Sequence, residues 1–525
     1  MLPYIFPVAA GLLLSAAFPR ANQAWLGWLA WIPLILFIAR STSRRAAFLG
    51  GWLTGFVGFF ILLRWMPAVM SGYGGMSQVL SWAAYALLIA VFACYPAAVC
   101  AFTRHLMFYR GDRCLLLFPF VWIVIELAFS VSPFDGFPWL LAGYTQTRFL
   151  TVIQIADITG IYGVSFLVIC VNTALAWLFH KEASFVCARL RRVELPNLPK
   201  ISAFAPLVIA AALTAVVLIY GHSAVNRWEK TEAPFQSALL QGNISVDDPY
   251  EVILEKFESG YARMADSLAP NSVDILVLPE SPVPKLFQND ESYRSEMENQ
   301  ARRYPLGMVI SNIRKGQKDG TDAHFNSAFF LSGDGSLVGV YDKIHLVPFG
   351  EYIPFKKLLF FAETVSKEMG GFSEGENLRI LPLGERPANA LICFEAVFPD
   401  LARRFVERGS QVIVNLTNDG WYGISAAPYQ HLEIARVRAV ENRRYFLRAA
   451  NTGFSAVIEP TGRIAASTGL AEEAICLGRF GFIEEQTFYT RYGDVFAWLC
   501  VIIFAAAWIW AMFGDGKLKG NLRKP

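Results

Sequence analysis

The sequence predicts a multi-domain protein in which an eight-helix α-helical transmembrane bundle carries an α/β domain inserted before its last helix. Three observations predict this class. Of the 525 residues, 54% are hydrophobic and only 17% are charged, against about 25% charged in an ordinary globular domain. Eight apolar stretches approach the length of about 20 residues that a bilayer requires. One long polar stretch, residues 222–492, separates the seventh apolar stretch from the eighth.

The eight apolar stretches are each predicted to form one membrane helix. They run over Leu2–Phe18, Ala24–Ile38, Ala46–Leu63, Val79–Phe102, Cys114–Val131, Ile161–Phe179, Ala203–Tyr220 and Val495–Phe513. The first could be a cleaved signal peptide, but no Lys or Arg precedes its apolar run, so we expect a retained helix. The domains are therefore predicted as 1–221 with seven helices, 222–492, and 493–525 with the last helix and a basic tail.

The formal net charge of +3 is the sum of two unlike parts. Residues 221–492 contain 28 Lys and Arg against 35 Asp and Glu, whereas the rest of the chain contains 18 against 8. Alternate loops of the membrane part hold fifteen basic residues, and the opposite loops hold three. Short loops rich in Lys and Arg stay in the cytoplasm, so both termini are predicted there and the polar domain outside it. This topology explains the basic residues without any nucleic-acid partner.

The fifteen basic residues predicted to lie on the cytoplasmic side all flank apolar stretches. They are Arg40, Arg44, Arg45, Arg104, Arg110, Arg113, Lys181, Arg189, Arg191, Arg192, Lys200, Lys517, Lys519, Arg523 and Lys524.

The polar insert is long enough to bury a core of its own, and its pattern is that of an α/β domain with mixed sheets covered by helices. Short apolar runs predict strands at Ser237–Leu240, Asp274–Leu278, Gly307–Ile313, Ser327–Leu331, Leu337–Asp342, Ala388–Cys393, Val412–Asn415, Phe446–Ala450 and Ser455–Glu459. Helical patterns cover Glu251–Leu268, Pro399–Glu407 and Tyr429–Asn442. Glycine-containing turns at Ser332–Gly335 and Pro460–Arg463 favour hairpins.

One predicted outer loop, residues 132–160, is rich in aromatic side chains, including Trp139 and Tyr144. Trp and Tyr are typical of the level of lipid headgroups, so the loop can be an interfacial anchor. It can equally frame an opening toward a lipid. The sequence leaves both interpretations open.

Cys393 is the candidate nucleophile of the polar domain. It ends an apolar strand, and a helical pattern begins a few residues later, which is where sheet enzymes present reactive groups. A buried inert thiol and a disulfide with Cys476, the other cysteine of this domain, are the alternatives.

A thiol needs a base, because its ordinary pKa of about 8.5 leaves it protonated at neutral pH. Glu280 and Lys343 each follow another apolar strand, as Cys393 does. A carboxylate, an ammonium and a thiol at three strand ends fit a base, an oxyanion-stabilising cation and a nucleophile. His345 and His431 are rival candidates for the base.

Three segments carry a resemblance to a known family. They are LPESPVP around Glu280, YDKIHLVPFGEYIP around Lys343, and ICFE around Cys393. Together they resemble the Glu-Lys-Cys triad of the nitrilase superfamily, whose domain is an αββα sandwich. The Lys343 segment, the eight-helix pattern, and the sequences FPW at 137–139, GY at 143–144 and NDGWYG at 418–423 resemble the membrane-bound apolipoprotein N-acyltransferase family over essentially the whole chain.

This resemblance implies a ping-pong acyl transfer. No metal-ligand cluster or nucleotide-binding glycine motif is evident in the sequence, so no cofactor or metal is expected. Glu280 takes the thiol proton, Cys393 attacks a phospholipid ester, and Lys343 holds the oxyanion. Phosphatidylethanolamine is the implied donor, and the N-terminal amine of a diacylglyceryl-cysteine lipoprotein is the implied acceptor. The implied location is the bacterial inner membrane, with residues 222–492 periplasmic and the protein a monomer.

The resemblance also implies further site residues. Glu351 and Glu395 match acidic positions that support the triad, Trp421 matches a lipid-contacting aromatic, and Asn326 matches a structural strand motif. Two positions depart from the family pattern. Phe394 stands where Tyr is expected, and Asp247–Tyr250 stands where Lys-Trp is expected, so that Tyr250 is the aromatic there.

Two other functions remain as alternatives. A membrane-tethered nitrilase-like amidase would use the same triad, although one membrane anchor would then suffice. A catalytically silent scaffold would not explain why Glu280, Lys343 and Cys393 occur together.

Overall fold

The computed structural model describes residues 4–72, 74–132, 135–190, 201–245, 247–281, 283, 285–348, 350–352 and 371–513. Seven of the basic residues that predict the topology lie outside these ranges: Arg191, Arg192, Lys200, Lys517, Lys519, Arg523 and Lys524. The chain divides into two compact units. The helical unit comprises 1–64, 82–223 and 494–525, and the α/β unit comprises 65–81 and 224–493.

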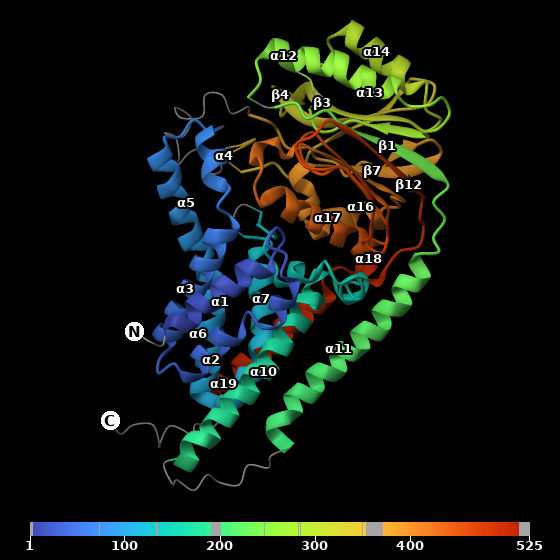
Figure 1. The fold of residues 1–525 in the computed structure, drawn as a ribbon. Coiled ribbons are helices and arrows are strands. Elements are labelled where there is room, and N and C mark those ends of the chain that lie inside the picture. Colours follow the sequence, from blue (N-terminus) through green and yellow to red (C-terminus); the bar gives the residue numbers. More distant parts are fainter. Residues whose placement is uncertain are drawn as a thin grey trace. The chain divides into compact units, whose positions relative to one another are not determined.

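The helical unit contains a helix in each predicted apolar stretch (Figure 1). The helices are α1 (Ile5–Ala17), α2 (Ile32–Arg40), α3 (Arg44–Leu62), α5 (Gln78–Phe92), α6 (Cys94–Arg110), α7 (Phe118–Phe129), α10 (Ile161–Leu190), α11 (Ile201–Trp228) and α19 (Val495–Phe513), with the short helices α8 (Leu150–Ile153) and α9 (Ala156–Thr159) and 3-10 turns between them. α5 and α6 together occupy one predicted span.

Five helical segments of the described residues have the length and hydropathy to cross a membrane. They are Arg44–Leu62, Gln78–Arg110, Ile161–Lys181, Ala203–Trp228 and Val495–Phe513. The first, second and fifth predicted spans form shorter α-helices. α7, for example, begins only at Phe118, with Pro119 in its first turn, and has 12 residues, or about 18 Å at 1.5 Å per residue.

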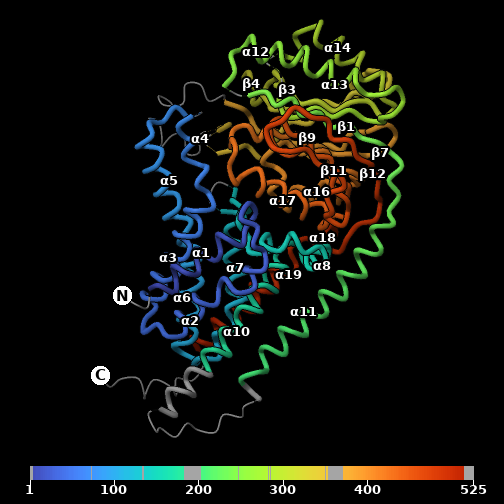
Figure 2. Tube along the Cα trace, in the orientation of Figure 1, coloured from blue at the N-terminus to red at the C-terminus, as the bar shows by residue number. Residues whose placement is uncertain are grey.

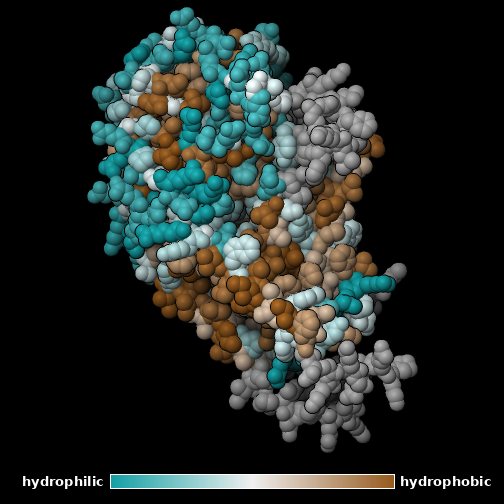
Figure 3. Space-filling model, turned by 180° about the vertical axis from the view of Figure 1, so that it is seen from behind, coloured by the Kyte–Doolittle hydropathy of each residue, from teal (hydrophilic) through white to brown (hydrophobic). Residues whose placement is uncertain are grey.

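Small residues allow close helix packing in this unit. A Cβ on Gly51 of α3 would lie 2.6 Å from the carbonyl oxygen of Pro96, and one on Gly55 would lie 2.5 Å from Pro96 Cγ. Such approach is typical of membrane helices, which gain most from van der Waals contact. Hydrophobic side chains dominate the surface formed by this unit in Figure 3, whereas the α/β unit is largely hydrophilic there.

The α/β unit contains two six-stranded sheets, ordered β12-β1-β2-β3-β4-β5 and β11-β10-β9-β8-β7-β6. The first sheet contains β1 (Phe235–Gln241), β2 (Ile275–Val277), β3 (Gly307–Lys318), β4 (Thr321–Leu331), β5 (Leu337–Asp342) and β12 (Ala474–Phe480). The second contains β6 (Leu381–Leu383), β7 (Arg386–Ile392), β8 (Ile413–Thr417), β9 (Phe446–Ala450), β10 (Ala456–Ile458) and β11 (Ile464–Ser467). β1, β2 and β3 are parallel, as are β7, β8 and β9.

Helices cover the outer faces of the sheets, which gives the predicted αββα layering (Figure 1). α12 (Tyr250–Glu255), α13 (Ala262–Asp266) and α14 (Glu291–Ala301) cover the first sheet, and α16 (Pro399–Glu407) and α17 (Ala427–Asn442) cover the second. Buried aromatic side chains fill the space under α12–α14, among them Phe257, Tyr261, Phe287, Tyr293 and Phe329. Figure 2 traces β1 and β12 side by side, where the two ends of the unit pair antiparallel.

The expected strands and both glycine turns are present, and the differences concern polar or short elements. Gly335 and Gly462 have positive φ, as the predicted hairpin turns require. The predicted helix Glu251–Leu268 contains a wider π-type turn at Lys256–Tyr261 between α12 and α13. α14 was not predicted, because only Tyr293, Met297 and Ala301 of its 11 residues are buried.

Candidate active site

Cys393 lies directly after β7, at the first position of a 3-10 turn that covers Cys393–Val397. Its φ of +50° places it in the left-handed region, which is unfavourable for a residue with a Cβ. Its neighbour Ile392 donates its N–H to Glu395 Oε2 at 2.7 Å. The chain therefore turns sharply at Cys393 where β7 ends. This turn directs the buried thiol toward side chains at the ends of other strands.

Glu280 follows β2 and is buried. Its Oε1 accepts a hydrogen bond from Asn326 Nδ2 at 2.8 Å, and its Oε2 accepts one from the N–H of Asn418 at 3.0 Å. Burial raises the pKa of Glu280, while the Lys343 charge and hydrogen bonds from Asn326 and the Cys393 side chain oppose that rise. The carboxylate that contacts the thiol is thus a stronger base than an exposed glutamate.

Lys343 follows β5 and is only 1% exposed. Its Nζ lies 2.9 Å from both carboxylate oxygens of Glu351 and 3.5 Å from Glu280 Oε1. Burial alone would lower the pKa of Lys343, but the two carboxylates outweigh burial and raise it. The side chain is therefore a fixed cation beside the thiol.

Asn326 of β4 joins the two carboxylates. Its Nδ2 donates to Glu280 Oε1 at 2.8 Å and to Glu351 Oε1 at 3.0 Å. Because Nδ2 donates to two carboxylates, the orientation of the amide is fixed. In the flipped orientation the Asn326 carbonyl oxygen would face both carboxylates and repel them. The sequence favoured a structural role for Asn326, and the structure places its side chain in direct contact with both acidic residues.

Glu395 lies two residues after the cysteine and is fully buried. Its Oε1 accepts hydrogen bonds from Tyr341 Oη at 2.7 Å and from the N–H groups of Ile344 at 2.7 Å and His345 at 3.2 Å. Burial raises the pKa of Glu395 to about 7, against the lowering effect of these donors. One carboxyl group thus ties the turn after β5, which carries Lys343, to the turn after β7.

The Cys393 thiol is protonated in this environment. Burial raises its pKa, the nearby Glu280 carboxylate raises it further, and Lys343 only partly offsets both effects. Cys393 and Cys476 are both free thiols, so the disulfide alternative is not realised in the structure. A reaction at this sulfur requires a group that accepts its proton, and Glu280 is in contact with it.

The predicted aromatic and histidine residues have different surroundings. Phe394 is buried, and its ring packs edge-on against Phe398 at a centroid distance of 5.1 Å. His345 stacks on the same Phe398 ring at 4.3 Å. The side chain of Tyr250, at the start of α12, is exposed, and so is that of Trp421, after β8. Trp139 and Tyr144 are buried within the helical unit.

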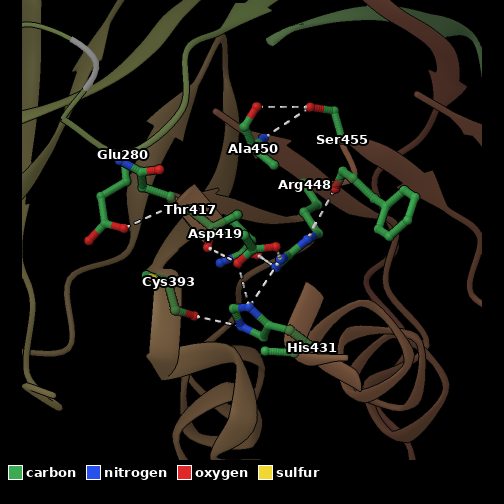
Figure 4. Close-up of polar contacts among 12 residues, drawn as sticks. Glu280, Cys393, Thr417, Asp419, His431, Arg448, Ala450 and Ser455 are labelled. Carbon is green, nitrogen blue, oxygen red and sulfur yellow. Dashed lines mark hydrogen bonds and ion pairs between the residues drawn. The ribbon is translucent and has the colours of Figure 1, made fainter. Parts of the chain in front are cut away.

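A second buried cluster was missed by the sequence reasoning. Asp419, His431 and Arg448 contact one another beside Cys393 (Figure 4). His431 was considered as a base, but its Nε2 lies 3.2 Å from the carbonyl oxygen of Cys393. Arg448 was the available signal, because it is a charged residue in the apolar strand Phe446–Ala450 and a buried charge requires a partner.

Among the residues that the structure describes, no group of three His, Cys, Asp or Glu side chains is arranged to hold a metal ion. The site around the Cys393 thiol contains the Lys343 ammonium and the carboxyl groups of Glu280, Glu351 and Glu395.

Two family descriptions match this chain. Residues 10–174 match the apolipoprotein N-acyltransferase N-terminal domain, and residues 238–480 match the carbon-nitrogen hydrolase family. The second match includes Glu280, Lys343 and Cys393, and it identifies the two-sheet unit as nitrilase-like.

Full-length relatives agree with these matches. An apolipoprotein N-acyltransferase from Geobacter metallireducens is 39% identical over 503 residues, covering 95% of this chain and 93% of the relative. Another, from Rhodopseudomonas palustris, is 30% identical over 531 residues, covering 94% and 92%. A solved structure of Saccharomyces cerevisiae Nit3, of the nitrilase superfamily, is 20% identical and covers 47% of this chain and 89% of that chain, with a TM-score of 0.36. The chain belongs to the apolipoprotein N-acyltransferase family and is an acyltransferase with a nitrilase-like catalytic fold.

Proposed function

We propose that the protein transfers a fatty acyl chain from a phospholipid, through a thioester on Cys393, to the N-terminal α-amine of a diacylglyceryl-cysteine lipoprotein. Phosphatidylethanolamine, attacked at its sn-1 ester, is the proposed donor. The carbon-nitrogen hydrolase match alone would also admit an amidase, but the N-terminal match and the full-length relatives favour acyl transfer. We expect a single chain to be sufficient for both half-reactions.

In the first half-reaction Glu280 accepts the proton of Cys393, and the thiolate attacks the ester carbonyl. Moving this proton leaves the net charge of the buried site unchanged, which avoids creating a new buried charge. Lys343 stabilises the oxyanion of the tetrahedral intermediate. The ester C–O bond then breaks, the departing lysophospholipid oxygen takes the proton from Glu280, and the acyl group remains on sulfur.

In the second half-reaction the lipoprotein amine attacks the thioester carbonyl. Glu280 accepts the amine proton, the C–S bond breaks, and the thiolate recovers the proton as the amide product leaves. The acid and the base are the same carboxyl group, which is why a raised pKa suits this residue.

One observation carries this proposal: the Glu280 carboxylate and the Lys343 ammonium lie 3.5 Å apart, and both act on the pKa of the Cys393 thiol. Glu351 supports the reaction by holding Lys343, and Glu395 supports it by joining the two turns. Phe394 would line the apolar side of the thiol. Tyr250 and Trp421, whose side chains are exposed, are proposed lipid contacts. Trp139 and Tyr144, expected from the sequence to contact substrate, are buried and are proposed to shape the lipid site from within the helical unit.

The proposed setting is the bacterial inner membrane, which eight helices would span. The uneven distribution of Lys and Arg supports cytoplasmic termini and a periplasmic α/β unit. This arrangement would bring the thiol to the leaflet in which both lipid substrates reside. Attachment of a maleimide to a cysteine introduced near Lys343, from the periplasmic side only, would support it, and attachment from the cytoplasm only would refute it.

The transfer itself is tested with phosphatidylethanolamine carrying a heavy-isotope sn-1 chain and a synthetic diacylglyceryl-cysteine peptide. Full-length protein should move the heavy chain to the peptide amine, and Cys393→Ala should move none. Cys476→Ala is the matched control, because Cys476 is also a buried free thiol and should be dispensable. Absence of transfer, together with hydrolysis of small amides, would favour the amidase instead.

A further inference from the structure

Asp419, Arg448 and His431 form a buried polar cluster that the acyl-transfer chemistry does not use. Arg448 and His431 are 0% exposed and Asp419 is 1% exposed. Three such groups are costly to bury unless their hydrogen bonds are satisfied, so their presence here requires an explanation. Figure 4 shows them meeting beside Cys393; Arg448 comes from β9, His431 from α17 and Asp419 from the turn after β8.

Arg448 anchors the cluster through hydrogen bonds to Asp419 and Asn415. Its Nη2 donates to Asp419 Oδ2 at 2.8 Å, and its Nη1 donates to Asn415 Oδ1 at 2.6 Å. Asn415 Nδ2 in turn donates to the carbonyl of Leu391, two residues before the cysteine, at 2.9 Å. Burial would raise the pKa of Asp419, but the charges of Arg448 and His431 outweigh it and lower the pKa to about 2.

His431 connects this pair to the backbone of the cysteine. Its Nε2 lies 3.2 Å from the carbonyl oxygen of Cys393, which can only accept, so Nε2 carries a proton. Its Nδ1 lies 3.0 Å from Asp419 Oδ1 and 3.0 Å from Arg448 Nη2. Burial and the Arg448 charge lower the pKa of His431, whereas the Asp419 charge raises it. Arg448 and Asp419 thus hold the Nδ1 side of the ring, and the ring presents its Nε2–H to Cys393.

The backbone that His431 contacts is strained. The φ of +50° at Cys393 is a conformation that is unfavourable for a residue with a Cβ, and it persists only where the surroundings enforce it. Glu395 holds the N-terminal side of this turn through the N–H of Ile392. His431 holds the carbonyl of Cys393 itself.

Gly453 packs directly against the Asp419 carboxylate of the same cluster. A Cβ at Gly453 would lie 2.2 Å from Asp419 Oδ2, so any other residue would displace the carboxylate. Thr417 donates to Asp419 Oδ1 at 3.3 Å, and its side chain also contacts the Cys393 thiol. The cluster therefore meets the cysteine at its carbonyl and near its sulfur.

We propose that His431, oriented by Asp419 and Arg448, is a positioning residue whose Nε2–H holds the carbonyl of Cys393 and thereby aims the thiol at Glu280. This role excludes a base function for His431 at the thiol, because the nitrogen nearest Cys393, Nε2, points its proton at the Cys393 carbonyl. The proposal rests on Cys393 being the nucleophile of the proposed function.

The test compares His431→Gln with His431→Leu in the full-length protein. Gln can place an N–H donor near the position of Nε2, whereas Leu has none. The readout is the rate at which iodoacetamide alkylates Cys393, followed by peptide mass spectrometry across a pH series. Leu should slow alkylation about tenfold, as expected for a displaced reacting group, and Gln should keep the rate within about threefold of wild type.

Ser410→Ala is the matched control. Ser410 is fully buried, and its hydroxyl donates to Asn389 of β7 at 2.7 Å. The substitution removes a buried hydrogen bond of the same sheet that does not involve the cysteine. Its alkylation rate should equal that of wild type. Thermal unfolding of each variant separates slower alkylation from loss of the fold.

Two results would overturn the proposal: wild-type alkylation by a folded His431→Leu protein, or equal slowing by His431→Gln and His431→Leu. If His431→Leu does not fold, Arg448→Lys takes its place, since it retains the charge but removes the guanidinium Nη2 that contacts both Asp419 and His431 Nδ1. Unchanged alkylation in Arg448→Lys would also overturn the proposal. Iodoacetamide needs no lipid, so a failure of phospholipid to acylate Cys393 would count against the proposed function alone.

Discussion

The ammonium of Lys343 lies 2.9 Å from each carboxylate oxygen of Glu351. Glu280 is farther from the same ammonium, at 3.5 Å. Glu351 is thus the primary partner of Lys343, and this arrangement leaves the Glu280 carboxylate available to the thiol. The two glutamates have different tasks although they share one cation and one amide.

Glu351→Gln should slow thioester formation by about 10²-fold, because the ammonium would shift toward Glu280 and away from the oxyanion. The rate is measured as the appearance of acylated Cys393 by mass spectrometry. Glu484→Gln is the control, since Glu484 is an exposed carboxylate that pairs with Arg386. An unchanged rate in Glu351→Gln would show that Lys343 does not depend on this contact.

Glu280→Gln should slow thioester formation by about 10²–10⁴-fold, the usual contribution of a general base. In the wild-type protein the rate should fall as the pH is lowered through the pKa of Glu280, since only the carboxylate accepts a proton. Burial raises that pKa, so the fall should begin above the pH at which an ordinary glutamate titrates, 4.5. A pH profile without this limb would place the base elsewhere.

Asn326→Ala should slow thioester formation roughly tenfold, because a hydrogen bond to a charged group contributes about 1.5 kcal/mol. The Asn326 amide donates to both Glu280 and Glu351. Without it the repulsion between these two carboxylates is less compensated, which raises the pKa of Glu280. The acid limb of the pH profile should therefore move to higher pH than in wild type. A structural role alone would lower the unfolding temperature and leave the limb in place.

Glu395→Gln should lower the free energy of unfolding by about 1–3 kcal/mol, since its amide N–H₂ would face the N–H of Ile392. The folded-state pKa of Glu395, about 7, exceeds its ordinary value of 4.5. The stability that protonated Glu395 contributes is fully present below about pH 4.5 and is lost as the pH rises through about 7. The stability difference between wild type and variant should shrink over that interval, as measured by unfolding temperature. A difference that grows with pH would contradict the raised pKa.

The sequence predicted the strands that end at the site better than the contacts made there. Glu280, Lys343 and Cys393 each follow a strand with a clear apolar run, so β2, β5 and β7 could be recognised without a structure. Their convergence follows from the topology, in which strands of two different sheets end at one edge. Apolar periodicity identifies each strand separately and does not show which strand ends lie together.

The supporting residues were harder to predict, because their side chains act through non-local contacts. Asn326 lies in a strand that reads as ordinary, and its bridging role depends on two carboxylates 46 and 25 residues away. Arg448 was detectable as a charge in an apolar strand, but its partner Asp419 was not. The short or polar elements β6, β11 and α14 gave no apolar pattern strong enough to predict.

The central claim is that Cys393 carries the acyl group. The direct measurement is the mass of the full-length protein after incubation with a phospholipid and no acceptor, before and after hydroxylamine. We predict a mass increase of one fatty acyl chain that maps to Cys393, is absent in Cys393→Ala, persists in Cys476→Ala, and is removed by hydroxylamine. A wild-type protein that consumes phospholipid without this adduct, or that carries it on another residue, would contradict the account.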